Sequence, residues 1–146
     1  MAMTFELSGD YGYVVLVLAA YIFFNFWMSI QVLLARERYN VDFPTMYALE
    51  SENKDAKLFN CIQRGHQNSL EMMPAFVVTL LLSGLYCPVG AAALGVVYTV
   101  GRYYYFKGYA TGVPDNRLTV GRFAFMALLG LMILTTVVGV RLVLSR

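Results

Sequence analysis

Residues 123–140, with the sequence FAFMALLGLMILTTVVGV, contain no charged side chain. A second apolar stretch, VVLVLAAYIFFNFWMSIQVLLA at residues 14–35, is interrupted by Asn25 and Gln31. About 20 predominantly apolar residues form a helix that crosses the roughly 30 Å hydrocarbon core of a bilayer. Each stretch therefore predicts one membrane-spanning helix.

The composition indicates a small membrane protein with a single domain. Of the 146 residues, 59% are hydrophobic and 14% are charged, whereas charged residues approach roughly a quarter of a soluble domain. The net charge of +2 is small, and the basic residues are not interleaved with aromatic residues as in a nucleic-acid binder. We therefore expect an all-α integral membrane bundle with no nucleic-acid partner.

Two further apolar runs, residues 72–86 and 89–100, are too short to span a membrane on their own. They rise about 18 to 23 Å as helices, so each must recruit adjoining polar sequence. The second span extends backwards toward Phe59, and the third extends forwards toward Tyr109. The chain, residues 1–146, is thus predicted to be one four-helix domain with spans near residues 12–36, 59–86, 89–109 and 118–143.

The distribution of Lys and Arg predicts the orientation in the membrane. Consecutive spans alternate in direction, which places the loops at residues 36–58 and 112–121 on the same side. That side carries most of the basic residues: Arg36, Arg38, Lys54, Lys57, Lys107, Arg117 and Arg122. Because positive charge accumulates on the cytoplasmic side, we expect these loops in the cytoplasm and both termini in the lumen.

One face of the second span is polar. Arg64, Asn68 and Glu71 are spaced at i, i+4 and i+7, so they share a helix face over about 10 Å of rise. A charged side chain at mid-helix depth costs on the order of 3 kcal/mol on insertion scales. This face is therefore expected to contact protein or a water-filled cavity.

The third span carries a matching face formed by Arg102, Tyr105 and Tyr109, at i, i+3 and i+7. The two faces are expected to meet near the cytoplasmic side, where ionisable groups exceed what packing requires. This surplus indicates a site for a charged ligand. The alternative is that Arg64 and Glu71 pair with each other or with Arg102 and only hold the bundle together.

The sequence gives little support to several other kinds of site. His66 alone cannot form a zinc site, which needs three or four ligands, and we expect no metal. Ser-His-Asp sets and glycine-rich phosphate loops do not appear, so hydrolase and nucleotide-binding functions are poor explanations. Cys61 and Cys87 lie about one membrane thickness apart in the predicted topology and are expected to be free thiols.

The run FNCIQRGHQNSLE at residues 59–71 resembles the signature of the type-3 microsomal glutathione transferases. These enzymes belong to the MAPEG superfamily of membrane-associated proteins in eicosanoid and glutathione metabolism. A second block, GRYYYFKGY at residues 101–109 followed by TGVP at residues 111–114, is similar to the same family. The resemblance extends over nearly the whole chain.

This resemblance implies a homotrimer in the endoplasmic reticulum membrane, with glutathione as co-substrate bound at subunit interfaces. It implies glutathione transferase, glutathione peroxidase or leukotriene C synthase-type activity. Together with the helical spacing, it gives the predicted glutathione-binding residues: Arg36, Arg64, Asn68, Glu71, Arg102, Tyr105 and Tyr109. Arg117 matches the family's arginine beside the glutathione sulfur, with a one-residue loop insertion relative to leukotriene C synthase, and is the predicted catalytic residue.

Two positions depart from the synthase pattern, since Glu37 replaces an arginine and Met72 replaces a tyrosine. These departures favour conjugation to lipophilic electrophiles or reduction of lipid hydroperoxides over leukotriene synthesis, which stays open. In this hypothesis Arg64 binds a glutathione carboxylate, Glu71 binds its ammonium group, and Arg117 stabilises the thiolate. The second substrate arrives from the membrane lipid. Two alternatives stay open: a non-catalytic lipid-binding accessory protein of the same superfamily, and a structural or channel-like protein with four spans.

Overall fold

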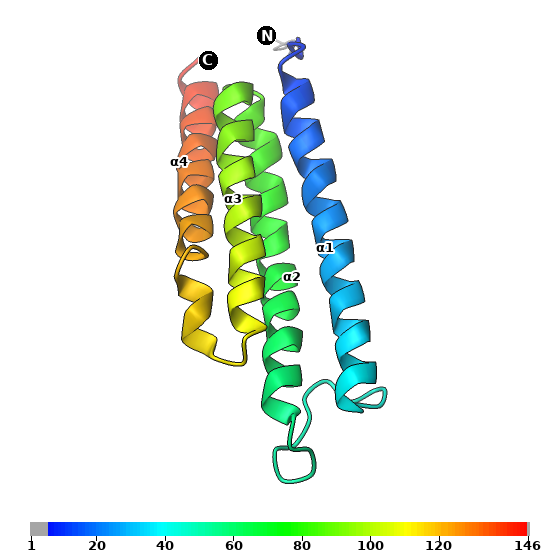
Figure 1. The fold of residues 1–146 in the computed structure, drawn as a ribbon. Coiled ribbons are helices and arrows are strands. Elements are labelled where there is room, and N and C mark those ends of the chain that lie inside the picture. The colour runs from blue at the N-terminus through cyan, green and yellow to red at the C-terminus, as the bar shows by residue number, and fades with distance from the viewer. Residues whose placement is uncertain (1–5, 146) are drawn as a thin grey trace.

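A computed structural model describes residues 6–145, which form an up-and-down bundle of four α-helices (Figure 1). The elements are α1 (Tyr11–Tyr39), α2 (Ala56–Gly84), α3 (Pro88–Tyr109), a 3-10 helix η1 (Pro114–Leu118) and α4 (Arg122–Leu144). Both ends of the described chain lie at one end of the bundle, and the α1–α2 and α3–α4 connections lie at the other. The predicted all-α, four-helix fold is confirmed.

Helix α1 ends at a residue in the left-handed conformation. Asn40 has φ 53°, a region that Asn adopts more readily than most residues and that commonly terminates helices. The backbone N–H groups of Asn40 and Val41 both donate to the Arg36 carbonyl, the latter over 3.0 Å. The chain turns here toward α2, and the α1–α2 loop that follows packs against α2.

Helices α2 and α3 reach membrane-spanning length because they include polar ends, as the short apolar runs predicted. Their 29 and 22 residues rise about 43 and 33 Å. Helix α3 begins with Pro88 in its first turn, where the missing N–H and fixed φ of proline are tolerated. Helix α4 begins at Arg122 rather than near residue 118, because η1 and a turn occupy residues 114–121.

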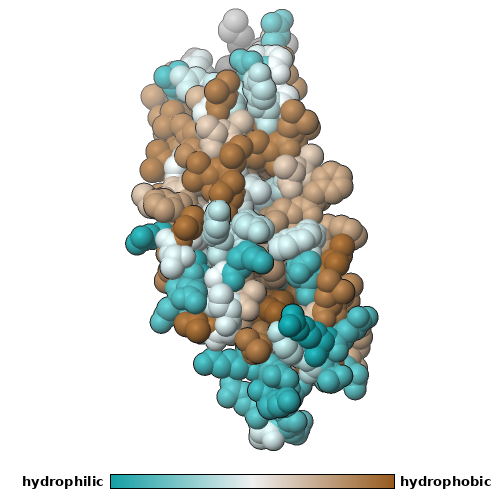
Figure 2. All heavy atoms as spheres, in the orientation of Figure 1, coloured by the Kyte–Doolittle hydropathy of each residue, from teal (hydrophilic) through white to brown (hydrophobic). Residues whose placement is uncertain are grey.

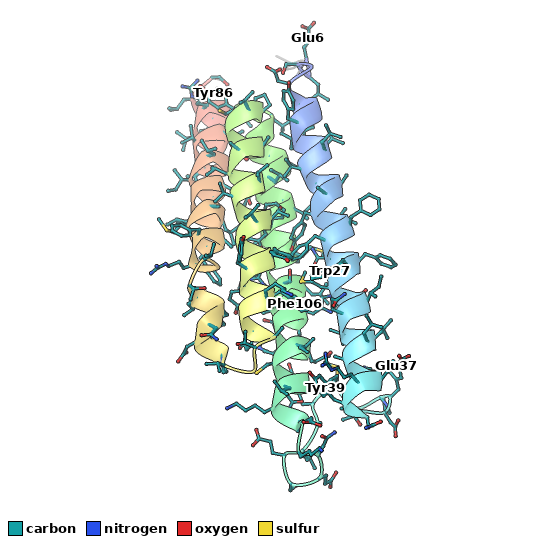
Figure 3. The ribbon with its side chains drawn as sticks, in the orientation of Figure 1. Glu6, Trp27, Glu37, Tyr39, Tyr86 and Phe106 are labelled. Carbon is teal, nitrogen blue, oxygen red and sulfur yellow. The ribbon has the colours of Figure 1, made fainter. Side chains whose placement is uncertain are left out.

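The interior of the bundle is largely aromatic and apolar. Phe76 stacks on Tyr98 with 4.0 Å between ring centroids, and Tyr21 meets Phe76 nearly edge-on at 4.6 Å. Trp27 of α1 packs edge-on against Phe106 of α3 at 5.6 Å (Figure 3). Small and apolar side chains of α4 complete the core: Ala124, Ala127, Leu128 and Leu131.

The outer surface of the bundle is apolar as well. Among the described residues, α1 and α4 are the helices that are long and apolar enough to cross a membrane, and only 22% and 28% of their most hydrophobic segments are buried. Phe23, Phe26 and Met126 are 75%, 66% and 64% exposed. Figure 2 shows apolar residues over the half of the bundle near the termini and hydrophilic residues gathered at the opposite end. An exposed apolar coat of this extent fits lipid rather than water as the surroundings.

Candidate functional site

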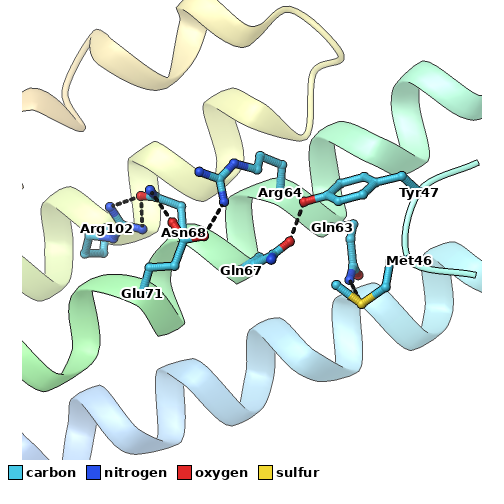
Figure 4. Close-up of polar contacts among 8 residues, drawn as sticks. All are labelled: Met46, Tyr47, Gln63, Arg64, Gln67, Asn68, Glu71 and Arg102. Atoms are coloured by element: carbon cyan, nitrogen blue, oxygen red, sulfur yellow. Dashed lines mark hydrogen bonds and ion pairs between the residues drawn. The ribbon is translucent and has the colours of Figure 1, made fainter. Parts of the chain in front are cut away.

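A polar cluster lies on one face of α2, toward the loop end of the bundle. The Arg64 Nη1 atom lies 2.7 Å from Glu71 Oε1, and the Asn68 side-chain amide donates to Glu71 Oε2 over 3.3 Å (Figure 4). One carboxylate thus accepts from two donors of the same helix. The prediction that these three residues share a face is confirmed.

The polar face of α3 meets this cluster through Arg102. Its Nη1 and Nη2 atoms both donate to Asn68 Oδ1 over 3.0 Å, and its guanidinium carbon lies 4.2 Å from the centre of the Tyr105 ring. Arg102 is 1% exposed and Tyr105 is 5% exposed. The predicted meeting of the two faces is therefore confirmed, and it occurs inside the bundle.

These bonds fix the orientation of the Asn68 amide. Because both guanidinium donors of Arg102 point at Oδ1, the NH₂ group of Asn68 faces Glu71. A continuous path of hydrogen bonds thus runs from the buried Arg102 through Asn68 and Glu71 to Arg64. Charge-assisted hydrogen bonds of this type are roughly twice as strong as neutral ones.

The geometry weighs against the Arg64–Glu71 pair as a clamp between helices. Both residues belong to α2, so their ion pair joins no two helices. A polar link from α2 to α3 is instead made by the Arg102–Asn68 contact. The side chains of Arg64 and Glu71 are 39% and 44% exposed on the isolated chain. Both charged groups are therefore accessible to a ligand.

A cavity of about 330 Å³ lies beside Arg64. This volume is at the lower end of the roughly 300 to 1,000 Å³ typical of small-molecule sites. Its lining residues come from the α1–α2 loop, α2, the end of α3 and the start of η1: Tyr47, Glu50, Lys57, Asn60, Cys61, Arg64, Tyr109 and Pro114. Of the predicted glutathione-binding residues, Arg64 and Tyr109 are among those that line the cavity. The ring of Tyr105 packs edge-on against Tyr109 at 5.6 Å.

Tyr47 in the α1–α2 loop lines this cavity, and sequence reasoning did not include it among the candidate site residues. The Asn60 amide binds both the N–H and the carbonyl of Ala48, over 2.8 and 2.9 Å, and so fastens the loop to α2. This brings the Tyr47 hydroxyl to Gln67, whose side-chain oxygen accepts its hydrogen bond (Figure 4). Helical periodicity carries no information about a loop residue, although the quoted signature does contain Asn60 and Gln67.

Arg36 lies apart from the Arg64 cluster within the chain. Its Nη1 atom donates to the Thr45 carbonyl over 2.8 Å, and its guanidinium carbon lies 4.5 Å from the centre of the Phe43 ring. It borders a different hollow, of about 370 Å³, on the α1–α2 side of the bundle, where His66 is also found. One chain alone therefore does not bring Arg36 to the other predicted glutathione-binding residues.

Arg117 lies on the α3 side of the cavity, in η1. Its guanidinium carbon is 5.2 Å from the centre of the Tyr109 ring, within the range of a cation–π contact. Its Nη1 atom donates to the Pro114 carbonyl over 2.7 Å. Since Tyr109 also lines the cavity with Arg64, the structure places Arg117 next to the predicted site, one aromatic ring away.

The fold and this site define a class of protein: a small polytopic membrane bundle with an accessible ion pair and a cavity beside it at the loop end. The profile of the MAPEG family matches residues 14–137, and the match covers most of the chain. The chain belongs to the MAPEG family. The prediction of a four-helix membrane bundle of this family is thereby confirmed.

The chain is also similar to individual named proteins. Microsomal glutathione S-transferase 2 of Bos taurus is 37% identical over 109 residues, which make up 71% of this chain and 70% of the relative. The Homo sapiens protein of that name is 34% identical over 109 residues, or 71% and 69% of the two chains. Leukotriene C4 synthase of Cavia porcellus is 38% identical over 85 residues, or 58% and 52%. The finer assignment to the type-3 microsomal glutathione transferases stays a prediction.

Proposed function

We propose that this protein is a membrane-bound, glutathione-dependent enzyme that forms the glutathione thiolate and transfers it to lipophilic electrophiles. Similarity to proteins named glutathione S-transferase and leukotriene C4 synthase supports glutathione as the co-substrate. The observation that carries the proposal is the accessible Arg64–Glu71 pair, of which Arg64 lines a cavity of about 330 Å³.

The charges of this pair match those of glutathione, which has two carboxylates, one ammonium group and one thiol. The Arg64–Glu71 ion pair breaks, and the planar guanidinium of Arg64 binds a glutathione carboxylate through two parallel hydrogen bonds. Glu71 then accepts the ammonium group. Binding replaces one ion pair by two, so neither protein charge is left uncompensated in a site of low dielectric.

The remaining residues of the cluster orient the bound tripeptide. Asn68 and the hydroxyl groups of Tyr105 and Tyr109 supply hydrogen-bond partners for its peptide groups. Arg102 completes the proposed glutathione-binding set, and its two bonds to Asn68 Oδ1 support the assignment by holding the Asn68 amide toward Glu71.

Arg117 is the proposed catalytic residue. A free thiol has a pKa near 8.5, and the thiolate is the reactive form. Lowering that pKa by about 2 units requires about 2.7 kcal/mol of preferential stabilisation of the anion. A guanidinium about 4 Å from the sulfur offers up to about 4 kcal/mol at an effective dielectric constant near 20, so one arginine is sufficient.

The second substrate is a lipophilic electrophile or a lipid hydroperoxide that reaches the site through the membrane. With an electrophile, the thiolate sulfur attacks carbon, a C–S bond forms, and the leaving group departs with its electron pair. With a hydroperoxide, the sulfur attacks the terminal oxygen and the O–O bond breaks, which gives a sulfenic acid and a lipid alkoxide. The alkoxide takes up a proton, equivalent to the one released when the thiol ionised, and becomes the lipid alcohol. A second glutathione then yields the disulfide and water.

We further propose a homotrimer in the endoplasmic reticulum membrane, with the loop end in the cytoplasm and the termini in the lumen. Charged side chains at membrane depth face protein or a cavity, and the 39% and 44% exposure of Arg64 and Glu71 in one chain supports a neighbouring subunit as their cover. Arg36, which borders a different hollow, would then reach the site from that neighbour.

The test is to add glutathione to the detergent-solubilised protein and follow the ultraviolet absorbance of the thiolate. We expect an absorbance increase that saturates with glutathione and is absent with S-methylglutathione, which has no ionisable thiol. Glutathione binding without thiolate formation would overturn the enzymatic proposal and favour the non-catalytic accessory protein. Absence of any glutathione binding would reject the site itself.

A further inference from the structure

The connection from α3 to α4 is packed against α3 at unusually short range. Its 3-10 helix, η1, lies beside the end of α3 (Figure 1) and carries Arg117. The side chains of this segment are largely exposed, so side-chain burial does little to hold it. Its position relative to α3 depends instead on backbone contacts, and two glycines make these contacts sterically possible.

Gly108, in the last turn of α3, is covered by the backbone of η1. A Cβ atom at this position would lie 2.6 Å from the carbonyl carbon of Asn116 and 2.8 Å from the Cα atom of Arg117. The Asn116 carbonyl oxygen would be closer still. These are backbone atoms, which cannot rotate away as the end of a flexible side chain does.

Gly121 makes the second close approach, just before α4 begins. A Cβ atom there would overlap the Arg117 carbonyl oxygen and would lie 2.8 Å from the Cβ atom of Tyr105. The backbone of Arg117 is therefore approached closely by both Gly108 and Gly121. A Cβ atom at Gly108 requires η1 to move away from α3, and one at Gly121 requires the Arg117 carbonyl or the start of α4 to shift. Either change would displace the backbone around Arg117.

From this geometry we infer that Gly108 and Gly121 are positioning residues that fix the backbone of Arg117 against α3, so that its guanidinium stays over Tyr109 at the glutathione cavity. The inference deepens the proposed function, on which its catalytic consequence rests. It assigns no contact with substrate to either glycine. Electrostatic stabilisation falls with distance, so a displaced Arg117 stabilises a thiolate less well.

The first experiment tests the position of η1 without reference to catalysis. Limited trypsin digestion of the solubilised protein cuts the bond after Arg117 only as fast as this segment leaves α3, and the fragments identify the site by mass. We expect the rate of this cut to rise at least tenfold in Gly108→Ala and in Gly121→Ala. Unchanged cleavage in both variants, or cleavage of the unsubstituted protein as fast as that of an unfolded chain, overturns the inference.

Two glycines elsewhere provide matched controls. A Cβ atom at Gly95, also in α3, would lie 2.7 Å from a Val17 side-chain carbon and 3.0 Å from a Leu80 side-chain carbon, so Gly95→Ala disturbs packing far from η1. A Cβ atom at Gly139 meets nothing within 4 Å, so Gly139→Ala adds a methyl group without a clash. Both controls are expected to keep the slow cut after Arg117, and acceleration in Gly95→Ala equal to that in Gly108→Ala would contradict a local role.

The second experiment separates positioning from general loss of structure. In Gly108→Ala we expect kcat and the thiolate absorbance at neutral pH to fall about tenfold, with the calorimetric affinity for glutathione within about threefold of the unsubstituted protein. Retained affinity shows that the Arg64 cluster is folded. Faster cleavage with unchanged thiolate formation would uphold the positioning of Arg117 but reject its proposed catalytic role, whereas slow cleavage rejects the positioning itself.

Discussion

The two ends of this bundle are built from different chemistry, and the difference separates stability from function. Toward the termini, α1, α2 and α3 meet through stacked rings such as Phe76 and Tyr98, 4.0 Å apart. Toward the loops, α2 and α3 meet through Arg102 and Asn68. The first region is filled by buried rings, whereas the second exposes an ion pair beside a cavity.

The aromatic region therefore holds the helices together, whereas the polar region is available to bind a ligand. Packing of rings and small side chains drives helix association within a membrane. The Arg64–Glu71 pair, by contrast, joins residues of one helix and is about 40% exposed, so its loss removes little stability. Substitutions in the two regions are thus expected to affect different measurements.

The largest effect is expected from Phe76→Ala, which tests the aromatic region. Phe76 is fully buried and contacts both Tyr21 and Tyr98, and truncation of a buried Phe typically lowers the free energy of unfolding by about 3 to 5 kcal/mol. Unfolding in mixed micelles measures it. Phe23→Ala, at a residue 75% exposed, should change this free energy by less than about 0.5 kcal/mol. An equal loss of unfolding free energy in the two variants would contradict the distinction between the aromatic interior and the exposed apolar surface.

The next largest effect is expected from Arg117→Ala, which tests the catalytic end of the polar region. Loss of about 2.7 kcal/mol of thiolate stabilisation corresponds to a roughly 100-fold lower turnover, with glutathione affinity nearly unchanged. Steady-state kinetics with a model aryl halide measure the split between kcat and KM. Arg122→Ala is the matched control, because that side chain packs over Phe123 at 5.8 Å and lies outside the proposed site. Wild-type turnover in Arg117→Ala would exclude its catalytic role.

A smaller effect, on affinity rather than turnover, is expected from Arg64→Ala. The substitution removes a charge-assisted hydrogen bond to a glutathione carboxylate, worth at least about 1.5 kcal/mol, which corresponds to a Kd higher by roughly tenfold or more. Titration calorimetry with glutathione measures it, and Arg38→Ala in the last turn of α1 is the control. An unchanged Kd would mean that the ligand does not use this arginine.

The smallest effect is expected from Arg102→Lys, which tests how the polar region is organised. Lysine keeps the charge but cannot direct two donors at Asn68 Oδ1 as the guanidinium does. The Asn68 amide is then less firmly oriented, and we expect a Kd about fivefold higher. In a double-mutant cycle with Asn68→Ala, the two changes should be coupled by about 1 kcal/mol. Strict additivity would show that Arg102 does not act through Asn68.

The fold could be predicted from the sequence because hydropathy and helix length are local properties. The uncharged run at residues 123–140 and the short runs at residues 72–86 and 89–100 required four helices, and α2 and α3 do include the polar ends that their length demanded. The start of α4 could not be placed, since η1 and the turn at residues 114–121 depend on backbone contacts with α3.

Those site residues whose positions follow from helical spacing could be predicted from the sequence. Residues whose positions depend on a loop or on another subunit could not. Spacing along α2 and α3 brought Arg64, Asn68 and Glu71 onto one face and predicted their meeting with Arg102. Tyr47 could not be predicted because its position depends on the two hydrogen bonds between the Asn60 side chain and the loop backbone. Within one chain, Arg36 borders a different hollow from the cavity beside Arg64. The predicted role of Arg36 therefore depends on a second subunit.

The structure of the glutathione complex in a lipid environment would test the central claim most directly. The claim predicts the tripeptide in the cavity beside Arg64, with the Arg64 guanidinium moved from Glu71, now 2.7 Å away, onto a ligand carboxylate. Glu71 would accept the ligand ammonium group in its place. Glutathione bound elsewhere while the Arg64–Glu71 pair stays closed would contradict the account.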